Sequence, residues 1–352
     1  MLDEMVRHAG EWLRGSGPMN EIVISSRVRL ARNVAGYPFL SRTSENQRSE
    51  LMEMLRPHVV SAAGGAAGAF LDMNAISDLD QQVLVERHLV SRNLAEGKGS
   101  RGVAISKTEN VSVMVNEEDH LRIQVLRSGL QLDEIWRDIN ALDDKLESKI
   151  EYAFHPRYGY LTACPTNVGT GIRVSVMLHL PGLKLTGEIE RVFRAARDMR
   201  LAVRGLFGEG TEAAGDFFQV SNQVTLGRTE EDTINDFRLS VIPKIIEYEQ
   251  KARRTLVSER TISLDDRVWR SLGTLRHART ISSEEVMLHL SHLRLGVHLG
   301  RLKDVTIQTI NDLFLMSQPA HLQKVQGARL TGEQRSIARA ELIRRRLTPG
   351  MN

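Results

Sequence analysis

The sequence is poor in cysteine: Cys164 is the only one among 352 residues, so no disulfide can form within the chain. A lone thiol is typical of proteins that work in a reducing compartment. Long apolar runs are lacking too, and none approaches the ~20 residues that a membrane-spanning helix requires. The first residues, Met1-Leu2-Asp3-Glu4, do not show the basic-then-apolar order of a secretory signal. We therefore expect a cytoplasmic protein with no membrane partner.

A large excess of charge of one sign is also missing. The formal net charge is only +3, whereas nucleic-acid-binding domains normally concentrate basic residues in a stripe. Nucleic-acid binding is therefore the least favoured class of function. The apolar fraction of 41% and the charged fraction of 26% are ordinary for a soluble globular protein. Because single cores usually stop growing near ~250–300 residues, we expect one large domain and a smaller one.

Three closely spaced segments, 102–106, 111–115 and 121–126, show the residue pattern of strands. The connections between them are too short for a crossover helix, so neighbouring strands must be antiparallel. Other elements predicted before residue 229 are a short strand at 21–25, strands near 159–162 and 172–180, and helices over 45–60, 78–94, 131–151 and 187–202.

The last third of the chain has a different pattern. Thr229-Glu230-Glu231-Asp232 begins a long helix that is expected to run to about residue 254. Beyond 255 strand signals largely vanish, while helix starts recur. The sequence therefore predicts an α+β fold: residues 1–255 form a domain with a central antiparallel sheet flanked by helices, and residues 256–352 form an all-α C-terminal domain.

Two segments carry charged groups suited to chemistry. In Ser25-Ser26-Arg27-Val28-Arg29, at the end of the first predicted strand, alternation puts Arg27 and Arg29 on one face as a pair of guanidinium forks. The turn Asn116–Arg122 holds three adjacent carboxylates, Glu117, Glu118 and Asp119, which repel one another and should be compensated by a metal or another cation. Taken singly, both patterns are also typical of exposed surface.

Two further segments are rich in glycine. In Thr162–Arg173, Gly169 and Gly171 would let the backbone approach a ligand closely, and Cys164 lies in a polar turn, not in an apolar run. Arg204–Glu212 is a glycine-punctuated loop of the kind that closes over ligands, although an ordinary surface loop has the same composition.

In this order, the four segments resemble those of the phosphagen (ATP:guanido) kinases, the family of creatine and arginine kinases. The matching motifs are SSRVR, NEEDHLR, CPTNVGTGIR and the RG..GE loop, followed by Val220-Ser221-Asn222, and the match covers roughly residues 20–254. The resemblance implies a phosphagen-kinase-like catalytic domain over 1–255.

Phosphagen kinases carry a helical N-terminal domain of about a hundred residues, whose loop closes on the small substrate. Here SSRVR begins at residue 25, and the extra helical domain lies at the C-terminus. An acceptor site without that loop is open, so the resemblance is to the bacterial branch of the family that phosphorylates arginine residues of proteins.

The resemblance implies ATP and Mg²⁺ as cofactors. Arg27, Arg29, Arg122, Arg173 and Arg204 would form a cationic cradle for the phosphates. The full set of residues that would bind ATP is Ser25, Ser26, Arg27, Val28, Arg29, His88, Arg122, Arg173, Val174, Ser175, Val176, Met177, Arg204, Gly205, Leu206, Phe207, Gly208 and Glu209. His88 matches a family histidine near the nucleoside, although by itself it is typical of a half-buried helix position. Mg²⁺ would bridge the phosphates, and Glu117 would reach it directly or through water.

The acceptor guanidinium is a poor nucleophile because its pKa exceeds ~12 and its charge is delocalised. Two carboxylates that hold it from different sides would orient it and accept its proton. Glu118 and Glu209 match the substrate-binding glutamates of arginine kinases, and Cys164 as a thiolate would add a third negative contact. Removal of Glu118 is expected to cost more rate than removal of Cys164.

Near the C-terminus, Arg335-Ser336-Ile337-Ala338-Arg339-Ala340 resembles the family's regulatory pocket for phosphoarginine, formed here by Arg335, Ser336, Arg339 and Ala340. Arg335 and Arg339, four residues apart, would share a helix face and hold a phosphate. Ser336 replaces a family aspartate, which puts this regulation in doubt, and a solvated basic helix is the alternative. A zinc site at His289, His292 and His298 is disfavoured because no cysteine or carboxylate completes it.

The sequence therefore predicts a protein arginine kinase that marks proteins for chaperone–protease degradation during stress. The alternatives are a kinase of free arginine and a kinase-like adaptor for a ClpC-type chaperone. The resemblance further implies a homodimer, protein substrates bearing arginine, a zinc-binding activator of the McsA type, a ClpC-type AAA+ chaperone and a CtsR-type repressor.

Overall fold

A computed structural model describes residues 2–65, 68–206 and 214–348. Its centre is an eight-stranded sheet in the order β2-β3-β4-β5-β1-β8-β10-β9, and every neighbouring pair is antiparallel. The strands are β1 (Val23–Arg32), β2 (Ala69–Asp72), β3 (Gly102–Ile105), β4 (Val111–Val115), β5 (Leu121–Ser128), β8 (Ile172–His179), β9 (Leu201–Gly205) and β10 (Phe217–Asn222). A separate hairpin pairs β6 (Phe154–His155) with β7 (Gly159–Tyr160). The α+β fold class and the β3–β4–β5 meander expected from the sequence are confirmed.

The first strand differs from its prediction. β1 is ten residues long, begins at Val23 and ends at Arg32, so the SSRVR segment lies inside a central strand and not at its end. Pairing with β5 on one side and β8 on the other extends the strand beyond its apolar part. The arginines are therefore held on a rigid element.

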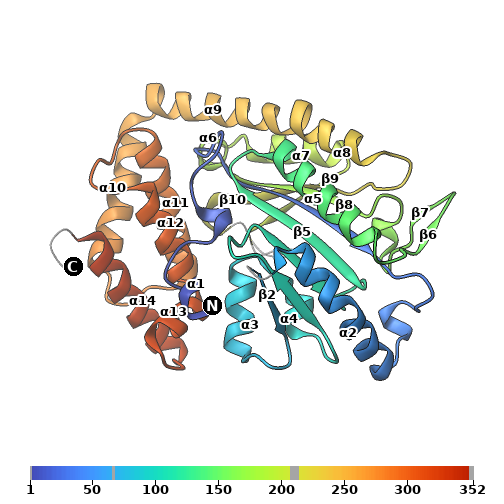
Figure 1. The fold of residues 1–352 in the computed structure, drawn as a ribbon. Coiled ribbons are helices and arrows are strands. Elements are labelled where there is room, and N and C mark those ends of the chain that lie inside the picture. Colours follow the sequence, from blue (N-terminus) through green and yellow to red (C-terminus); the bar gives the residue numbers. More distant parts are fainter. Residues whose placement is uncertain (1, 66–67, 207–213, 349–352) are drawn as a thin grey trace.

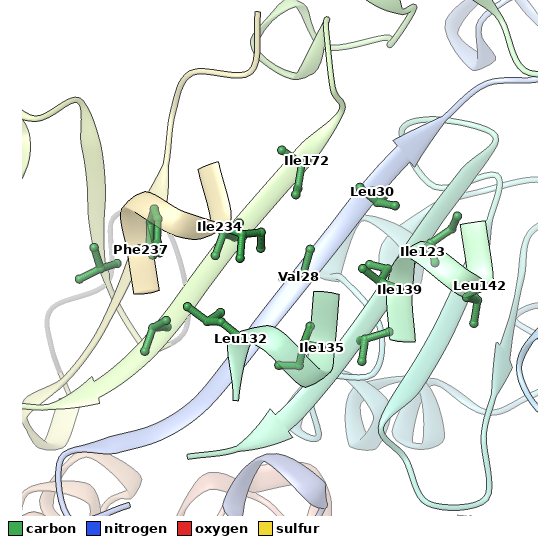
Figure 2. Close-up of a cluster of buried hydrophobic side chains, with 14 of the residues drawn as sticks. Val28, Leu30, Ile123, Leu132, Ile135, Ile139, Leu142, Ile172, Ile234 and Phe237 are labelled. Carbon is green, nitrogen blue, oxygen red and sulfur yellow. The ribbon is translucent and has the colours of Figure 1, made fainter. Parts of the chain in front are cut away.

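One face of the sheet is covered by helices. α2 (Glu45–Ala62), α5 (Leu132–Glu147) and α8 (Glu230–Asp236) lie on this side. The apolar stripe of α5, including Ile135 and Ile139, packs on Val28, Leu30 and Ile123 of the sheet (Figure 2). These five side chains are at most 1% exposed, and each contributes roughly 1.5–3 kcal/mol by burial. This core holds one face of the sheet, and α3 (Asp78–Glu86), α4 (Arg92–Glu96), η1 (Glu11–Leu13) and the C-terminal helices pack on parts of the other face.

Two predicted helices are divided in the structure, and a third is shorter than predicted. The segment 78–94 forms α3 (Asp78–Glu86) and α4 (Arg92–Glu96), because His88 between them has a left-handed φ of 58°. The helix predicted over 187–202 is shorter in the structure: it is α7 (Ile189–Asp198), which follows the separate helix α6 (Pro181–Thr186), and β9 begins at Leu201. The helix predicted from Thr229 comprises α8, a π-helical stretch over Phe237–Val241 and α9 (Ile242–Glu259), so it continues past the predicted domain boundary.

The C-terminal region consists of helices that pack beside the sheet (Figure 1). They are α10 (Thr261–His277), α11 (Ser283–His298), α12 (Ile307–Met316), α13 (Pro319–Gln326) and α14 (Gly332–Leu347). Their core also includes Trp12 and Leu13 of the short helix η1 (Glu11–Leu13) and the sheet side chains Leu126 and Phe217. The helical region and the sheet therefore share one apolar interface. No helix in the described residues is long and apolar enough to cross a membrane.

Candidate active site

The face of the sheet opposite to α5 collects the predicted arginines. Arg27 lies opposite Leu126 in β5 and Ser175 in β8, while Arg29 lies opposite Gln124 and Arg173. Side chains directly opposite each other across neighbouring strands point to the same face. Arg173 therefore joins Arg27 and Arg29 on the face opposite to Val28.

The remaining two arginines follow from the same register. Arg122 in β5 is opposite Ala31, two residues beyond Arg29. Arg204 in β9 is opposite Gln219, which in turn is opposite Met177. All five arginines therefore lie on one sheet face, which we call the arginine face; its members are Arg27, Arg29, Arg122, Arg173 and Arg204.

The guanidinium groups of this face repel one another. Burial, followed by the charges of Arg122 and Arg173, lowers the pKa of Arg27 to about 10. Burial and the same neighbours, together with Arg27, bring the pKa of Arg29 well below its ordinary value. Burial also lowers the pKa of Arg173, with Arg204 as the next cause. A bound polyanion would remove this repulsion, so the face is suited to a triphosphate.

Neutral groups partly satisfy these arginines. Arg27 donates from Nη2 to Gln219 Oε1 at 2.7 Å and from Nε to Ser175 Oγ at 3.3 Å, and Arg173 donates to Asn167 Oδ1 at 3.3 Å. Arg29 Nε is buried with no hydrogen-bond partner in the described part of the chain. Such an orphaned donor is what a site for an anion provides.

The three adjacent carboxylates have different partners, and Glu117 is compensated by a cation, as expected, which is Arg122. Glu117 forms an ion pair with Arg122 at 2.7 Å and accepts from Ser91 Oγ at 2.5 Å, and its side chain is only 1% exposed. Burial alone would raise the pKa of Glu117, but Arg122 and Ser91 bring it below its usual value. A direct Mg²⁺ contact would have to compete with Arg122.

Asp119 is structural. It is buried and accepts hydrogen bonds from Asn33 Nδ2 and from the backbone N–H of Ala163, both at 2.6 Å. Through Ala163 it ties the β4–β5 turn to the loop that carries Cys164. No group of three His, Cys, Asp or Glu side chains in the described residues is arranged to hold a metal ion.

Glu118 differs from both neighbours. It is exposed, and its carboxylate has no hydrogen-bond or ion-pair partner in the described residues. Partial burial raises its pKa, and so do the charges of Glu117 and Asp119, while Arg122 and Arg173 act in the opposite direction. A free carboxylate with a raised pKa beside a cationic face is suited to hold a second cation and take its proton.

Cys164 lies on the neighbouring loop, half-buried, with Sγ 3.0 Å from Thr166 Oγ1. The glycines of this loop approach the protein's own backbone, and not only a ligand as expected. A Cβ on Gly169, whose φ is 113°, would lie 2.5 Å from the carbonyl oxygen of Thr225, and one on Gly171 would lie 2.6 Å from that of Ala31. The loop is therefore packed tightly against its neighbours.

The sequence predicts His88 within a helix, but in the structure it follows the end of α3 and has a left-handed backbone conformation. Its backbone oxygen accepts from Gln124 Nε2 at 2.8 Å. Burial, then the charges of Arg27 and Arg29, lowers the pKa of His88 to about 3, so the ring is neutral at pH 7. His88 lies with Ser25, Arg27, Ser175 and Met177 around one small cavity at the β1 end of the arginine face.

Several residues predicted to bind ATP have side chains on the sheet face opposite to the arginine face. Four of them have fully buried side chains on the core side of the sheet: Ser26, Val28, Val174 and Val176. Ser26 Oγ donates to the backbone oxygen of Gly129 at 2.8 Å. Strand alternation leaves only their backbone atoms for a ligand, which corrects the prediction for their side chains.

The predicted ATP-binding residues at the end of β9 are described only in part. Gly205 pairs with Phe218, and Leu206 is buried in the core shared with the C-terminal helices. Phe207, Gly208 and Glu209 lie outside the described residues. The expected pairing of Glu118 with Glu209 therefore stays a prediction.

The predicted phosphoarginine pocket lies on α14. Arg339 is 3% exposed and donates to the backbone oxygens of Ser317 at 2.7 Å and Ile281 at 3.0 Å. Burial, then Arg335, lowers the pKa of Arg339. Arg335 donates to the oxygen of Leu330, and Ser336 Oγ to that of Gly332, while Ala340 is buried. Arg339 thus does not belong to a solvated basic helix.

Two polar groups at the site, Ser91 and Gln219, could not be predicted from the sequence. Ser91 caps α4 and holds Glu117, and Gln219 of β10 holds Arg27. Both lie far from their partners along the chain, and only the tertiary fold brings them together. His289 and His292 share Ser271 as a hydrogen-bond partner, at 3.1 and 2.9 Å, so a role in the protein's interior accounts for them.

A cationic face bordered by a free carboxylate is what the transfer of a phosphoryl group to a cationic acceptor requires. The family model of the ATP:guanido phosphotransferase C-terminal catalytic domain matches residues 50–252, and that of the protein-arginine kinase McsB C-terminal domain matches residues 261–351. The chain belongs to the ATP:guanido phosphotransferase family and, within it, to the protein-arginine kinases.

Relatives support both levels. A protein-arginine kinase of Bacillus cereus (strain G9842) is 46% identical over 350 residues, which cover 99% of this chain and 98% of the relative. One from Desulforamulus reducens is 47% identical over 340 residues, covering 96% and 95%. A solved structure of the duplicated taurocyamine kinase from Schistosoma mansoni superposes with a TM-score of 0.61 at 26% identity, over 71% of this chain and 35% of that one. A lombricine kinase, at 24% identity and a TM-score of 0.57 over 65% and 66% of the two chains, shows the same fold.

Proposed function

We propose that this chain transfers the γ-phosphoryl group of ATP to the guanidinium of arginine residues in proteins. The observation that carries the proposal is the arginine face with the unpaired carboxylate of Glu118 beside it. The five cations would hold the triphosphate, and Glu118 would hold the acceptor. The protein-arginine kinases that are 44–47% identical over nearly the whole chain favour arginine of a protein over free arginine.

The order of residues along β1 suggests how ATP lies. Arg29, with Arg173 and Arg122 beside it, is nearest to the turn that carries Glu118, so the γ-phosphate belongs there. Arg27 would hold the inner phosphates, and the nucleoside would then lie towards the start of β1, on the side of Ser25 and His88. This direction puts the phosphoryl group between the leaving oxygen and the acceptor.

In the reaction, a guanidinium nitrogen forms a bond to the γ-phosphorus while the bond from phosphorus to the β,γ-bridging oxygen breaks. The acceptor nitrogen loses its proton to the carboxylate of Glu118, and ADP leaves with the electron pair of the broken bond. Burial and the acidic neighbours raise the pKa of Glu118, which improves it as a proton acceptor. Cys164 and Glu209 are proposed as further contacts of the acceptor.

Magnesium is the expected companion of ATP, and it supplies charge neutralisation between the phosphates. Few protein carboxylates at the site are available as ligands for Mg²⁺. Glu117 is occupied by Arg122 and Ser91, and the described residues hold no cluster of three ligand side chains. We propose that the phosphates hold Mg²⁺ and that Glu117 acts through water.

The cellular location, oligomeric state and partner proteins of the enzyme are proposed from its membership of the family. They comprise a cytoplasmic homodimer, an activator of the McsA type, a ClpC-type chaperone, a CtsR-type repressor and a role in protein quality control under stress. The Arg335–Ala340 segment would bind phosphoarginine weakly, because Ser336 bonds to its own helix and offers no carboxylate.

The experiment incubates the purified chain with Mg–ATP and either a denatured protein or free arginine. Mass spectrometry under non-acidic conditions then locates the phosphate. Phosphate on arginine nitrogen of the protein is expected. Phosphorylation of free arginine alone would favour the small-molecule kinase, and phosphate only on hydroxyls, or none, would overturn the proposal in favour of another kinase class or an adaptor.

A further inference from the structure

A buried threonine holds the loop that carries Cys164. Thr225, which follows β10, is 3% exposed, and its Oγ1 lies 2.9 Å from the backbone oxygen of Thr166 and 2.8 Å from that of Val168. A hydroxyl has a single proton to donate, so the two carbonyl oxygens share it. Thr225 therefore binds the loop backbone on both sides of Asn167.

The backbone of Thr225 contacts the same loop further along the chain. Its carbonyl oxygen accepts from the N–H and from the hydroxyl of Thr170, both at 3.3 Å. The same oxygen lies against Gly169, where a Cβ would come within 2.5 Å of it. The stretch 166–170 is therefore held by one residue that lies outside the loop.

The segment that carries Thr225 is itself attached to the sheet. Asn222, the last residue of β10, donates from Nδ2 to the backbone oxygens of Ile172 and Val224, at 3.1 and 3.2 Å. Its Oδ1 accepts from the backbone N–H of Val174 at 2.8 Å. Because Ile172 and Val174 belong to the central strand β8, these bonds fix Thr225 relative to the sheet.

The part of the loop that Thr225 holds makes two contacts with the candidate active site. Thr166 Oγ1 is 3.0 Å from Cys164 Sγ, and Asn167 Oδ1 accepts from Arg173 of the arginine face at 3.3 Å. The hydroxyl of Thr225 bonds to the backbone at Thr166 and just beyond Asn167, so it acts on both contacts. Thr225 thus acts through other residues and not on the substrate.

We propose that Thr225 is a positioning residue for phosphoryl transfer, which sets the places of Cys164 and Asn167 relative to Arg173. The inference rests on the proposed function, in which Cys164 contacts the acceptor and Arg173 lies at the γ-phosphate. Release of the loop should therefore impair use of the acceptor. It should affect ATP binding less, because the other members of the arginine face still hold the triphosphate.

The test compares Thr225→Val with Thr225→Ser. Valine has nearly the same shape but no hydroxyl, whereas serine keeps the hydroxyl. Thr225→Val should lower kcat/KM for a denatured protein substrate about 3- to 10-fold, as expected for one buried hydrogen bond, while the Kd for ATP stays within about 2-fold. Thr225→Ser should restore kcat/KM to within about 2-fold of the native value.

Thr233→Val is the matched control. Thr233 is 2% exposed, and its hydroxyl donates to the backbone oxygen of Thr229 at 3.1 Å, at the start of α8. The same substitution there removes a buried hydrogen bond that does not reach the loop. Urea unfolding should show a loss of stability in both valine variants, but Thr233→Val should keep the native kcat/KM.

A second measurement needs no kinase activity. Cys164 is the only cysteine, so the rate of its alkylation by iodoacetamide reports on this loop alone. In Thr225→Val this rate should rise about 3- to 10-fold, because the half-buried thiol becomes more accessible when the loop opens more readily. Thr225→Ser and Thr233→Val should react as the native chain does.

The inference requires both effects of Thr225→Val. A variant that loses stability but keeps the native kcat/KM, or the native alkylation rate, would show that Thr225 is only structural and would overturn the inference. A native chain that does not phosphorylate arginine would overturn the proposed function together with it. An active native chain whose Thr225→Val variant behaves like Thr233→Val would overturn this inference alone.

Discussion

Replacing Glu118 by glutamine tests the centre of the proposed chemistry. The amide has nearly the same shape but cannot hold a cation or accept a proton. Since the carboxylate of Glu118 is exposed and has no partner in the described residues, the change breaks no structural contact. The free energy of unfolding should therefore move by less than about 0.5 kcal/mol. Loss of a general base typically costs about 10²- to 10⁴-fold in rate, or roughly 2.7–5.5 kcal/mol of activation free energy.

The assay measures the rate of phosphoarginine formation on a denatured protein at saturating ATP. Glu118→Gln should lower kcat by at least about 100-fold while the Kd for ATP changes little, because the nucleotide lies on the arginine face. Glu190→Gln, on the exposed first turn of α7, is the control and should behave as the native chain. A Glu118→Gln enzyme with kcat within 3-fold of native would refute the assigned role.

Three further changes probe the surroundings of the site. Asp119→Asn keeps the acceptor oxygen for Asn33 and Ala163 but removes a charge that raises the pKa of Glu118. Activity needs the ionised Glu118 and is lost as pH falls through its pKa, so the acid limb of kcat/KM should move to lower pH; a shift upward would contradict this. Arg32→Met leaves the buried carboxylate of Asp143 unpaired and should cost about 3–5 kcal/mol in urea unfolding, against less than about 1 kcal/mol for the exposed Arg270→Met. Glu86→Gln weakens three bonds to the start of α13 and should lower stability by about 1–2 kcal/mol, and an unchanged Tm would show that this junction is unimportant.

Part of this arrangement follows from local sequence. The spacing of 102–126 leaves no room for crossover helices, so the antiparallel β3–β4–β5 meander could be predicted. Alternation within one strand also put Arg27 and Arg29 on the same face. Such inferences need only neighbouring residues. The motifs then identified the family, which supplied the other three arginines.

Non-local pairing accounts for what the sequence could not give. β1 ends at Arg32 and lies between β5, which begins at Leu121, and β8, which begins at Ile172. Only this strand order brings Arg122 and Arg173 beside Arg29. Strand alternation puts the side chains of Ser26, Val174 and Val176 on the core face, whereas the family motif alone does not distinguish the two faces of a strand.

Alternation of side chains along β1 puts charged residues on one face of the sheet and core residues on the other. Five cations on one face repel one another, as the lowered pKa of Arg27 and Arg29 indicates, and this repulsion disfavours folding in the absence of an anion. The alternate residues Val28 and Leu30 bury their side chains behind them and contribute roughly 1.5–3 kcal/mol each. A rigid apolar face is therefore what allows the other face to remain charged and in place. Binding of a triphosphate relieves the repulsion without rebuilding the core, so affinity for the nucleotide and stability of the fold are coupled through the same strand.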